Sequence, residues 1–231
     1  IENIFQSGSS WNNIHWGSRL IFKDNLLYAS IGERGYGSVA QDPTSYFGKM
    51  IRINKDGTAP KDNPYSMNEE WLPEIYQIGL RNPQGIMLYP NDSEIYITNH
   101  GPRGGDFFGK VEAGTNYGWA DVAWGGIDYD GSIIGDGSAW KEGLLKPIYT
   151  WVPSIAVSDM TFYGGDLFPE LKNKILVTSL KAQRLISLEF DGKKARNETT
   201  LFEKVGRVRD VETNSAGEIY VIIDNEDSGI W

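Results

Sequence analysis

The sequence predicts an all-β protein built from short strands and tight turns. The 231 residues include 27 glycines, 12 tyrosines and 8 tryptophans, and this combination suits strands and turns rather than helices. No stretch of eleven or more residues keeps the 3.6-residue period of an amphipathic helix. A polar turn followed by an apolar strand recurs at Tyr28, Tyr96, Leu176 and Tyr220. The repeat favours a β-propeller with blades of about 40–50 residues, and a β-sandwich is the competing architecture.

The first third of the chain is expected to open with a loop or an incomplete strand over residues 1–14 and to continue as paired strands. Residues 19–22 and 26–31 are apolar runs on either side of a Lys-Asp-Asn turn. Residues 48–54 alternate with period two before a Lys-Asp-Gly turn, which predicts another strand. Residues 58–73 are polar and rich in proline, so they are expected to form a loop.

Residues 76–106 are the segment around which the rest of the chain is organised. Apolar runs at 86–89 and 94–98 flank a Pro-Asn-Asp-Ser turn, and this pattern predicts a hairpin. The motifs at 79–85 and 100–106 would therefore lie in loops at the same end of that hairpin. An arginine, an asparagine and the carbonyls of a Gly-Pro pair would converge there, and loops held by a rigid sheet commonly carry function.

The remainder of the chain is expected to hold a long ordered insertion followed by further strands. Residues 107–146 have few long apolar runs but contain clusters of glycine, tryptophan and tyrosine. Residues 128–131 resemble a short calcium loop but lack the spaced carboxylates of an EF-hand, so we interpret them as a turn. Strands are expected at residues 160–163, 174–179, 184–190, 208–212 and 218–223.

Composition excludes several classes of function. The formal net charge is −9 and no face rich in lysine and arginine is visible in the sequence, so nucleic acid is not an expected partner. Cysteine is absent, which excludes a disulfide framework, a thiolate nucleophile and a zinc–thiolate site. No run approaches the roughly 20 apolar residues that span a bilayer, so no membrane span is expected. The acidic balance is compatible with Ca²⁺ binding, although acidity is commoner as a source of solubility.

His15 is the candidate catalytic base, and it is one of only two histidines, the other being His100. Glu33 ends the hairpin that His15 precedes, so the antiparallel return would bring its carboxylate beside the imidazole. An imidazole oriented by a carboxylate is the usual arrangement for a general base near neutral pH. A lone histidine is more often a loop or core residue, and this alternative stays open.

Four further cations or amides are candidates for binding a charged ligand. Arg81 could hold a developing oxyanion or an anionic cofactor, with Asn82 as a neutral hydrogen-bonding partner; a turn stabilised by Arg81 is the structural alternative. Arg207 and Arg209 share one face of a strand because side chains alternate, which suits a ligand with several carboxylates. A cross-strand ion pair would explain these two arginines equally well.

Taken together, the motifs resemble the glucose/sorbosone dehydrogenase family of soluble sugar dehydrogenases that depend on pyrroloquinoline quinone (PQQ), and within it the aldose sugar dehydrogenase branch. The resemblance implies a six-bladed β-propeller, of which residues 1–231 would form one partial domain with about four blades. The matching segments fall in family order across nearly the whole chain, at residues 15–20, 40–42, 48–54, 62–64, 79–85, 100–106, 116–119, 153–158 and 207–211.

The resemblance also implies an activity and a set of site residues. Aldose sugars would be oxidised at the anomeric carbon to lactones, with hydride passing to PQQ and electrons to an external acceptor. His15 would take the proton of the C1 hydroxyl, Glu33 would orient it, and Arg81 would lie near the quinone oxygens. The other implied contacts are Asn82, Ser154, Lys181, Arg207 and Arg209 for PQQ, and the carbonyls of Gly101 and Pro102 for Ca²⁺. We expect one pocket to be lined by His15, Glu33, Arg81, Asn82, Lys181, Arg207 and Arg209.

Two departures from the family pattern change these expectations. Phe107 follows Asp106 where the family has glutamate, so a second, structural calcium site is not expected here. Family members also extend further at the N-terminus, so we expect a missing segment, another copy or another chain to complete the propeller. The family implies a periplasmic or secreted location. The alternative function is a non-catalytic propeller of the same family that binds protein or carbohydrate.

Overall fold

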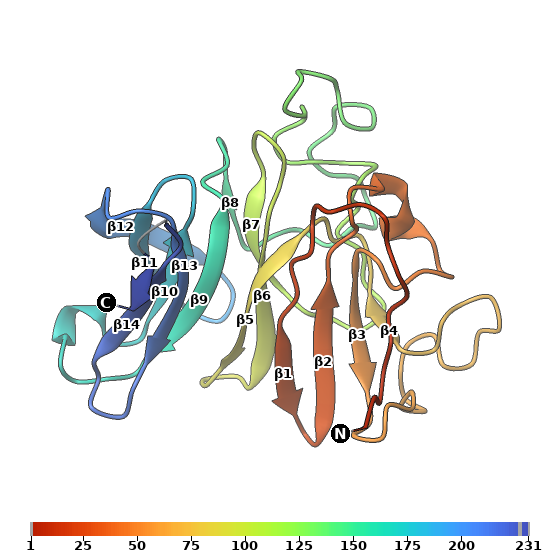
Figure 1. Ribbon diagram of the computed structural model, residues 1–231, viewed down its shortest axis with the longest axis horizontal. Coiled ribbons are helices and arrows are strands. Elements are labelled where there is room, and N and C mark those ends of the chain that lie inside the picture. Colours follow the sequence, from red (N-terminus) through yellow and green to blue (C-terminus); the bar gives the residue numbers. More distant parts are fainter. Residues whose placement is uncertain (1, 226–227, 231) are drawn as a thin grey trace.

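The computed structural model describes residues 2–225 and 228–230, which fold into four antiparallel sheets (Figure 1). Within each sheet, strands that are consecutive in the sequence are neighbours in space. The first two sheets contain β1 (Leu20–Lys23), β2 (Leu26–Ile31), β3 (Lys49–Ile53) and β4 (Ile75–Gln77), then β5 (Pro83–Tyr89), β6 (Glu94–Asn99), β7 (Asp106–Lys110) and β8 (Tyr149–Trp151). The last two contain β9 (Val157–Tyr163), β10 (Lys174–Ser179), β11 (Arg184–Phe190) and β12 (Ala195–Glu203), then β13 (Val208–Thr213), β14 (Ile219–Ile223) and β15 (Gly229–Ile230).

The four sheets are the blades of a β-propeller. Their first strands contact one another in sequence, β1 with β5, β5 with β9, and β9 with β13, so these strands surround a common axis (Figure 1). The helical elements of the described residues are two short 3₁₀ turns, η1 (Gly37–Gln41) and η2 (Pro169–Leu171). No helix within the described residues is long and apolar enough to cross a membrane. The all-β propeller, with about four blades represented, is therefore confirmed.

Each pair of consecutive blades encloses its own apolar core. The alternation of β5 shows how the sequence produces this packing, because Met87 and Tyr89 are buried whereas Leu88 between them is exposed. The Tyr89 hydroxyl donates a hydrogen bond to the carbonyl of Phe190 at 3.1 Å, which joins the second blade to the third. Burying each such large side chain stabilises the fold by about 1.5–3 kcal/mol.

The ten strands expected above are all present, and five further strands are observed among the described residues, namely β4, β7, β8, β12 and β15. The segments 174–179 and 184–190 coincide with β10 and β11. The prediction that the insertion begins at residue 107 is wrong, since β7 occupies its first residues and pairs with β6. The strands β4, β8 and β12 were also missed. β4 and β8 have three residues each, too few to show a period of two.

Candidate active site

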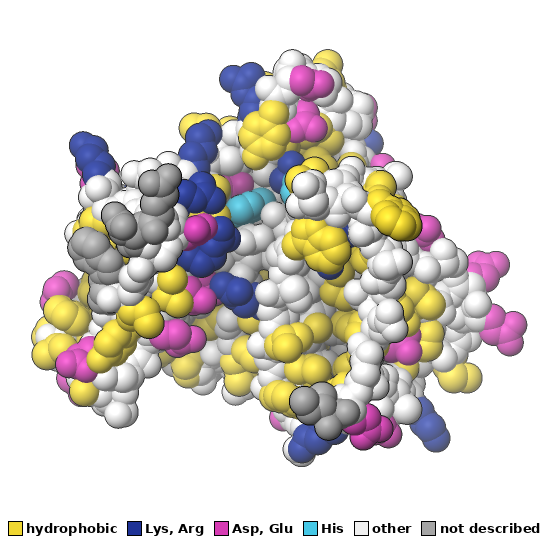
Figure 2. Space-filling model, viewed as in Figure 1, with side chains coloured by type: hydrophobic (Ala, Val, Ile, Leu, Met, Phe, Trp, Pro, Cys, Tyr) yellow, Lys and Arg dark blue, Asp and Glu magenta, His cyan; other side chains and the backbone are white. Residues whose placement is uncertain are grey.

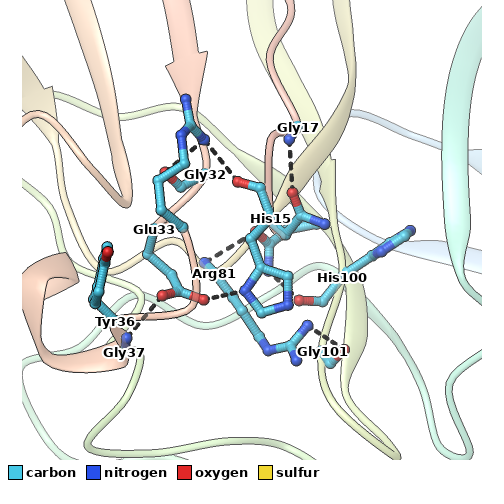
Figure 3. Close-up of polar contacts among 12 residues, drawn as sticks. His15, Gly17, Gly32, Glu33, Tyr36, Gly37, Arg81, His100 and Gly101 are labelled. Carbon is cyan, nitrogen blue, oxygen red and sulfur yellow. Dashed lines mark hydrogen bonds and ion pairs between the residues drawn. The ribbon is translucent and has the colours of Figure 1, made fainter. Parts of the chain in front are cut away.

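The base candidate His15 lies in the loop before β1, and Glu33 lies just beyond the end of β2. The hairpin of these two strands brings the Glu33 carboxylate onto Nδ1 of His15, as predicted (Figure 3). The other oxygen of Glu33 accepts a hydrogen bond from the backbone N–H of Gly37 at 2.7 Å. Glu33 is only 1% exposed. Its carboxylate is therefore fixed at both oxygens, and it orients the imidazole so that Nε2 is left for a ligand.

Arg81 is held beside this pair by the loop between β4 and β5. The backbone N–H of Glu33 donates to the carbonyl of Arg81 at 2.9 Å, and the Arg81 backbone N–H donates to Oδ1 of Asn99 at 3.2 Å. Its guanidinium donates to the carbonyl of Gly101 at 3.0 Å (Figure 3). The motifs on either side of the β5–β6 hairpin thus converge, as expected from the sequence. Burial lowers the pKa of Arg81, and its cation is 5% exposed.

Unlike its neighbour Arg81, Asn82 supports the site through hydrogen bonds to two other loops. Its side-chain oxygen accepts a hydrogen bond from the backbone N–H of Gly17 at 2.9 Å, two residues after His15. Its carbonyl accepts one from the N–H of His100 at 3.0 Å. Gly17 has no room for a side chain, because an added Cβ would lie 2.1 Å from the carbonyl oxygen of Pro83. Asn82 therefore ties the His15 loop to the second blade.

A cleft of about 660 Å³ opens at this end of the propeller. Volumes of a few hundred to about 1,000 Å³ are typical of small-molecule sites. Trp119 and Tyr129, both from the long insertion, place their rings 5.2 and 5.9 Å from the Arg81 guanidinium. The residues that line the cleft and bear on its chemistry are His15, Glu33, Arg81, Trp119, Asp128 and Tyr129.

Arg209 lies in a second hollow, of about 340 Å³, whose other walls are residues 16–19 of the His15 loop and Gln84 of β5. Figure 2 shows basic, acidic and histidine side chains gathered near the centre of the view. Nη2 of Arg209 is 2.7 Å from Oδ2 of Asp224, and Nε of Arg207 is 3.7 Å from the same oxygen. Nη1 of Arg209 donates to the amide oxygen of Gln84 at 3.3 Å. The two arginines do act together, but they share an aspartate as counter-ion.

His100 lines a small cavity together with Arg81, and its role was not predicted from the sequence. Its pKa is lowered to about 3, first by burial and further by the charges of Arg81, Arg209 and His15. Its Nε2 is buried and has no hydrogen-bond partner among the described residues. A buried polar atom without a partner costs stability. His100 is therefore a neutral imidazole with one unused polar atom, electrostatically coupled to both sides of the site.

A small cavity of about 20 Å³ adjoins the carbonyl-bearing loop of Gly101 and Pro102. Asp106 shapes this loop, because its carboxylate accepts hydrogen bonds from the backbone N–H groups of Gly101 at 2.9 Å and Ala156 at 2.6 Å. Burial raises the pKa of Asp106, and these hydrogen bonds oppose that shift. Phe107 packs its ring 4.6 Å from that of Tyr117 in the core. Asp106 thus serves as a backbone anchor in this loop.

The expectation that seven residues line one pocket holds for His15, Glu33 and Arg81 only. Arg209 lines the neighbouring hollow, and the buried Asn82 supports the loop behind the cleft. Ser154 is buried and accepts a hydrogen bond from the Asp106 backbone at 3.3 Å. Four of the predicted residues therefore line none of the cavities described above: Asn82, Ser154, Arg207 and Lys181, the last of which is exposed after β10.

Three residues of the site were not predicted as such, namely Asp224, Trp119 and Tyr129. Of these, Asp224 could have been found from the sequence. The register of β13 and β14 pairs Val208 with Ile223, so the next pair outward is Arg207 with Asp224. That register follows from the two predicted strands. Trp119 and Tyr129 gave no comparable indication, since only the tertiary folding of the insertion brings them over Arg81.

Several known proteins with similar sequences or structures are named as sugar dehydrogenases. The aldose sugar dehydrogenase YliI of Escherichia coli (strain K12) is 36% identical over 218 residues, which are 93% of this chain and 58% of that protein. Quinoprotein glucose dehydrogenase B of Acinetobacter calcoaceticus is 34% identical over 185 residues, 68% of this chain and 37% of that protein. A crystal structure of a glucose dehydrogenase has a TM-score of 0.94 at 32% identity, covering 98% of this chain and 66% of that one.

The chain thus spans less than two thirds of the length of these relatives. The family model described as Glucose / Sorbosone dehydrogenase nevertheless matches residues 1–231, the whole of the chain. The ordered motifs, the propeller blades and the similarity to YliI over nearly all of the chain lead to the same family. This chain belongs to the glucose/sorbosone dehydrogenase family.

Proposed function

We propose that the protein carrying this chain is a PQQ- and Ca²⁺-dependent dehydrogenase that oxidises the anomeric carbon of aldose sugars to a lactone. The observation that carries the proposal is the contact between His15 Nδ1 and the buried Glu33 carboxylate, at a cleft shared with the Arg81 cation. The similarity to an aldose sugar dehydrogenase and to a quinoprotein glucose dehydrogenase supports it. By family resemblance, we also propose a periplasmic or secreted location and an external electron acceptor.

The residues of the cleft suit a reaction in which a hydroxyl proton and a hydride leave the same C–OH group. Glu33 occupies Nδ1 of His15, so Nε2 is the atom that would accept the proton of the sugar C1 hydroxyl. PQQ, when bound, supplies the acceptor for the C1 hydride. Arg81 would stabilise negative charge that develops opposite His15, in a buried setting where such charges interact strongly. Loss of both hydrogens converts the cyclic aldose to its lactone.

The donor set fits a carboxylate-rich quinone. Arg207 and Arg209 share one aspartate oxygen, and two guanidinium groups side by side suit a ligand with several carboxylates. His100 adds a buried Nε2 that has no hydrogen-bond partner among the described residues and that feels the charges of Arg81, Arg209 and His15. In this proposal Arg207, Arg209, Ser154, Lys181 and Asn82 would contact PQQ.

The loop at Gly101 and Pro102 fits an ion in size and in ligand type. Its cavity of about 20 Å³ has room for about one water-sized sphere. Backbone carbonyls are hard oxygen ligands of the kind that Ca²⁺ takes, and they are neutral. Because these carbonyls are neutral, and the Arg81 cation donates to that of Gly101, we expect much of the negative charge that balances Ca²⁺ to come from PQQ. We therefore expect the two to bind together.

The test uses the full-length protein with PQQ and Ca²⁺ added separately and together. We expect the absorbance of PQQ to change on binding only when Ca²⁺ is present, and a chelator to reverse the change. An aldose should then bleach the oxidised cofactor, and an artificial electron acceptor should sustain turnover. Tight PQQ binding that is indifferent to chelation would contradict the calcium assignment. Absence of PQQ binding, with binding of a sugar or protein instead, would favour the non-catalytic member of the family.

A further inference from the structure

Arg34, the residue after Glu33, is a buried arginine that contacts the backbone of His15. Its Nη1 donates hydrogen bonds to the carbonyl oxygens of His15 at 2.6 Å and of Gly32 at 2.9 Å. Arg34 is 5% exposed and has a left-handed backbone, with φ of 61°. Such a conformation costs a residue with a side chain about 1–2 kcal/mol. The surrounding contacts therefore hold Arg34 in a costly position beside the base.

The guanidinium of Arg34 is also fixed by two aromatic rings. It lies 4.2 Å from the ring centre of Trp16 and 5.2 Å from that of Phe47. Each contact of this kind contributes roughly 0.5–2 kcal/mol, more where water is excluded. The Trp16 indole N–H in turn donates to the carbonyl of Asn12 at 3.2 Å. The plane of the guanidinium thus supports the polypeptide segment on which His15 lies.

The His15 segment needs such support because it has no regular secondary structure of its own. Residues 2–19 contain no strand or helix, and His15 has a left-handed backbone with φ of 55°. Glu33 fixes the imidazole through Nδ1, but a ring held at one atom can still swing if its backbone moves. Arg34 holds the carbonyl of the same residue. The two consecutive residues Glu33 and Arg34 therefore restrain His15 at its ring and at its main chain.

We propose that Arg34 is a positioning residue for the catalytic base: its guanidinium fixes the main chain of His15 and thereby the direction in which Nε2 faces the cleft. The inference deepens the proposed function and rests on His15 acting as the base. A displacement of about 1 Å of a catalytic group can cost on the order of 10²-fold in rate. Arg34 touches neither a sugar nor a cofactor in this proposal, and it acts only through His15.

The chemistry of the contact indicates which substitutions separate positioning from simple packing. Arg34→Ala removes the donor and the stacked plane together. Arg34→Lys keeps a cation that can donate to both carbonyls but loses the planar surface between Trp16 and Phe47. We therefore expect the lysine variant to lie between the wild type and the alanine variant in every measurement of His15 geometry.

The experiment compares these variants in the full-length protein by NMR of the imidazole N–H groups and by steady-state kinetics. A His15→Gln variant identifies the Nδ1 proton that is bonded to Glu33, because its resonance disappears. We expect that resonance to be broadened or lost in Arg34→Ala and partly restored in Arg34→Lys. In the presence of PQQ and Ca²⁺, Arg34→Ala should lower kcat by about 10–100-fold while KM changes by less than about threefold.

Arg52→Ala is the matched control. Arg52 also lies near two aromatic rings, at 5.9 Å from Tyr28 and 5.4 Å from Tyr76, and it pairs with Asp62 at 2.8 Å. It makes no contact with the His15 loop in the structure, so this variant should leave the His15 resonance and kcat unchanged.

Two results would overturn the proposal. One is an unchanged His15 resonance in a folded Arg34→Ala protein. The other is an Arg34→Ala protein that fails to fold together with an Arg34→Lys protein whose His15 resonance and kcat match the wild type. The NMR measurement needs no cofactor, so it decides the role of Arg34 even if the wild type oxidises no aldose. In that case the proposed activity fails separately.

Discussion

The two sides of the candidate site differ in how completely the folded chain organises them. On the His15 side, Glu33 and Arg81 are 1% and 5% exposed, and a backbone hydrogen bond joins them. The Glu33 carboxylate also contacts His15 and the backbone N–H of Gly37. On the arginine side, the side chains of Arg207 and Arg209 are 48% and 36% exposed, and both contact Asp224. The first side is a buried network, whereas the second is a set of half-exposed ion pairs.

The difference follows from the physical demands of the two tasks. A base must be in place before the proton moves, and buried hydrogen bonds in a low-dielectric setting can fix it there. Cations that capture an anionic ligand must stay accessible, and until then a neighbouring carboxylate can neutralise them. Exposed ion pairs are worth only about 0–1 kcal/mol, so a ligand carboxylate can replace Asp224 at little cost. We therefore infer that the His15 side is preformed and that the ligand completes the arginine side.

The sharpest test of a preformed base is His15→Gln in the full-length protein. Glutamine keeps a polar side chain of similar size but cannot take up the hydroxyl proton, so turnover should fall by about 10²–10⁴-fold. PQQ affinity should stay nearly unchanged, because the arginine side is untouched. Stopped-flow bleaching of the bound cofactor by an aldose measures the chemical step directly. Unchanged bleaching would remove His15 from the role of base.

On the arginine side, the largest effect should come from Arg209→Ala. A hydrogen bond between charged groups is worth about 1.5–3 kcal/mol, so PQQ should bind about 10–100-fold more weakly. The single-turnover rate at saturating PQQ should change far less, because the His15 side is intact. Arg196→Ala is the control, since Arg196 pairs with Asp191 at 3.3 Å on an exposed surface. A loss of rate without a loss of affinity in Arg209→Ala would contradict the division between the two sides.

A second group of charges lies next to the arginine side, around Arg19, which lines the same hollow as Arg209. Its charge compensation should be visible in the pH dependence of stability. Asp159 lies 3.6 Å from Nε of Arg19, and Nη2 of Arg19 lies 3.4 Å from Asp210. The pKa of Asp159 is raised, first by burial and then by its hydrogen bond to Asp210 and the charge of Asp210, whereas Arg19 opposes the shift. Between its unfolded pKa of about 3.9 and the folded value, the folded protein holds a proton that the unfolded chain releases.

Stability from this proton is therefore complete below about pH 4 and is lost as the pH rises through the folded pKa. The free energy of unfolding should fall by up to about 1.4 kcal/mol per pH unit over this window. Urea unfolding of Asp159→Asn should lack the slope, and the variant should gain stability relative to wild type at the alkaline end. Asp56→Asn is the control. A hydroxyl hydrogen bond from Thr58 lowers the pKa of that exposed carboxylate, so it stays ionised over the window in which Asp159 titrates. An equal slope in Asp159→Asn and wild type would exclude a shared proton.

How much of the fold could be predicted depended on where each strand lies in its blade. The strands β10 and β11 are central and apolar, so their bounds follow from the sequence. The outermost strand β12 reads Ala-Arg-Asn-Glu-Thr-Thr-Leu-Phe-Glu and has only partly buried or exposed residues. A strand of this kind has no buried face, so it shows no period of two. The edge of a blade is thus the least predictable part of it.

The site shows the same dependence on local versus distant contacts. The approach of Glu33 to His15 follows from one hairpin, and it could be predicted without knowledge of the rest of the fold. Arg34 looks like a solvated charge in a Gly-rich turn, because the rings of Trp16 and Phe47 that bury it come from separate segments. Residues held by one hairpin, such as Glu33 and also the missed Asp224, could be found from the sequence, whereas residues held by several segments could not.

The smallest effect is expected for Lys181, which separates the residues the structure supports from those implied by resemblance alone. Lys181 is exposed after β10, and its described interaction is a backbone hydrogen bond from its N–H to the carbonyl of Ile155 at 3.1 Å. If the arginine side keeps its present shape when PQQ binds, Lys181→Ala should weaken binding by less than about fivefold, the worth of an exposed ion pair. Fluorescence titration with PQQ at low and high salt measures this. A loss comparable to that of Arg209→Ala would instead mean that the turn carrying Lys181 closes over the ligand, which would make the contrast between a preformed and a ligand-organised side greater still.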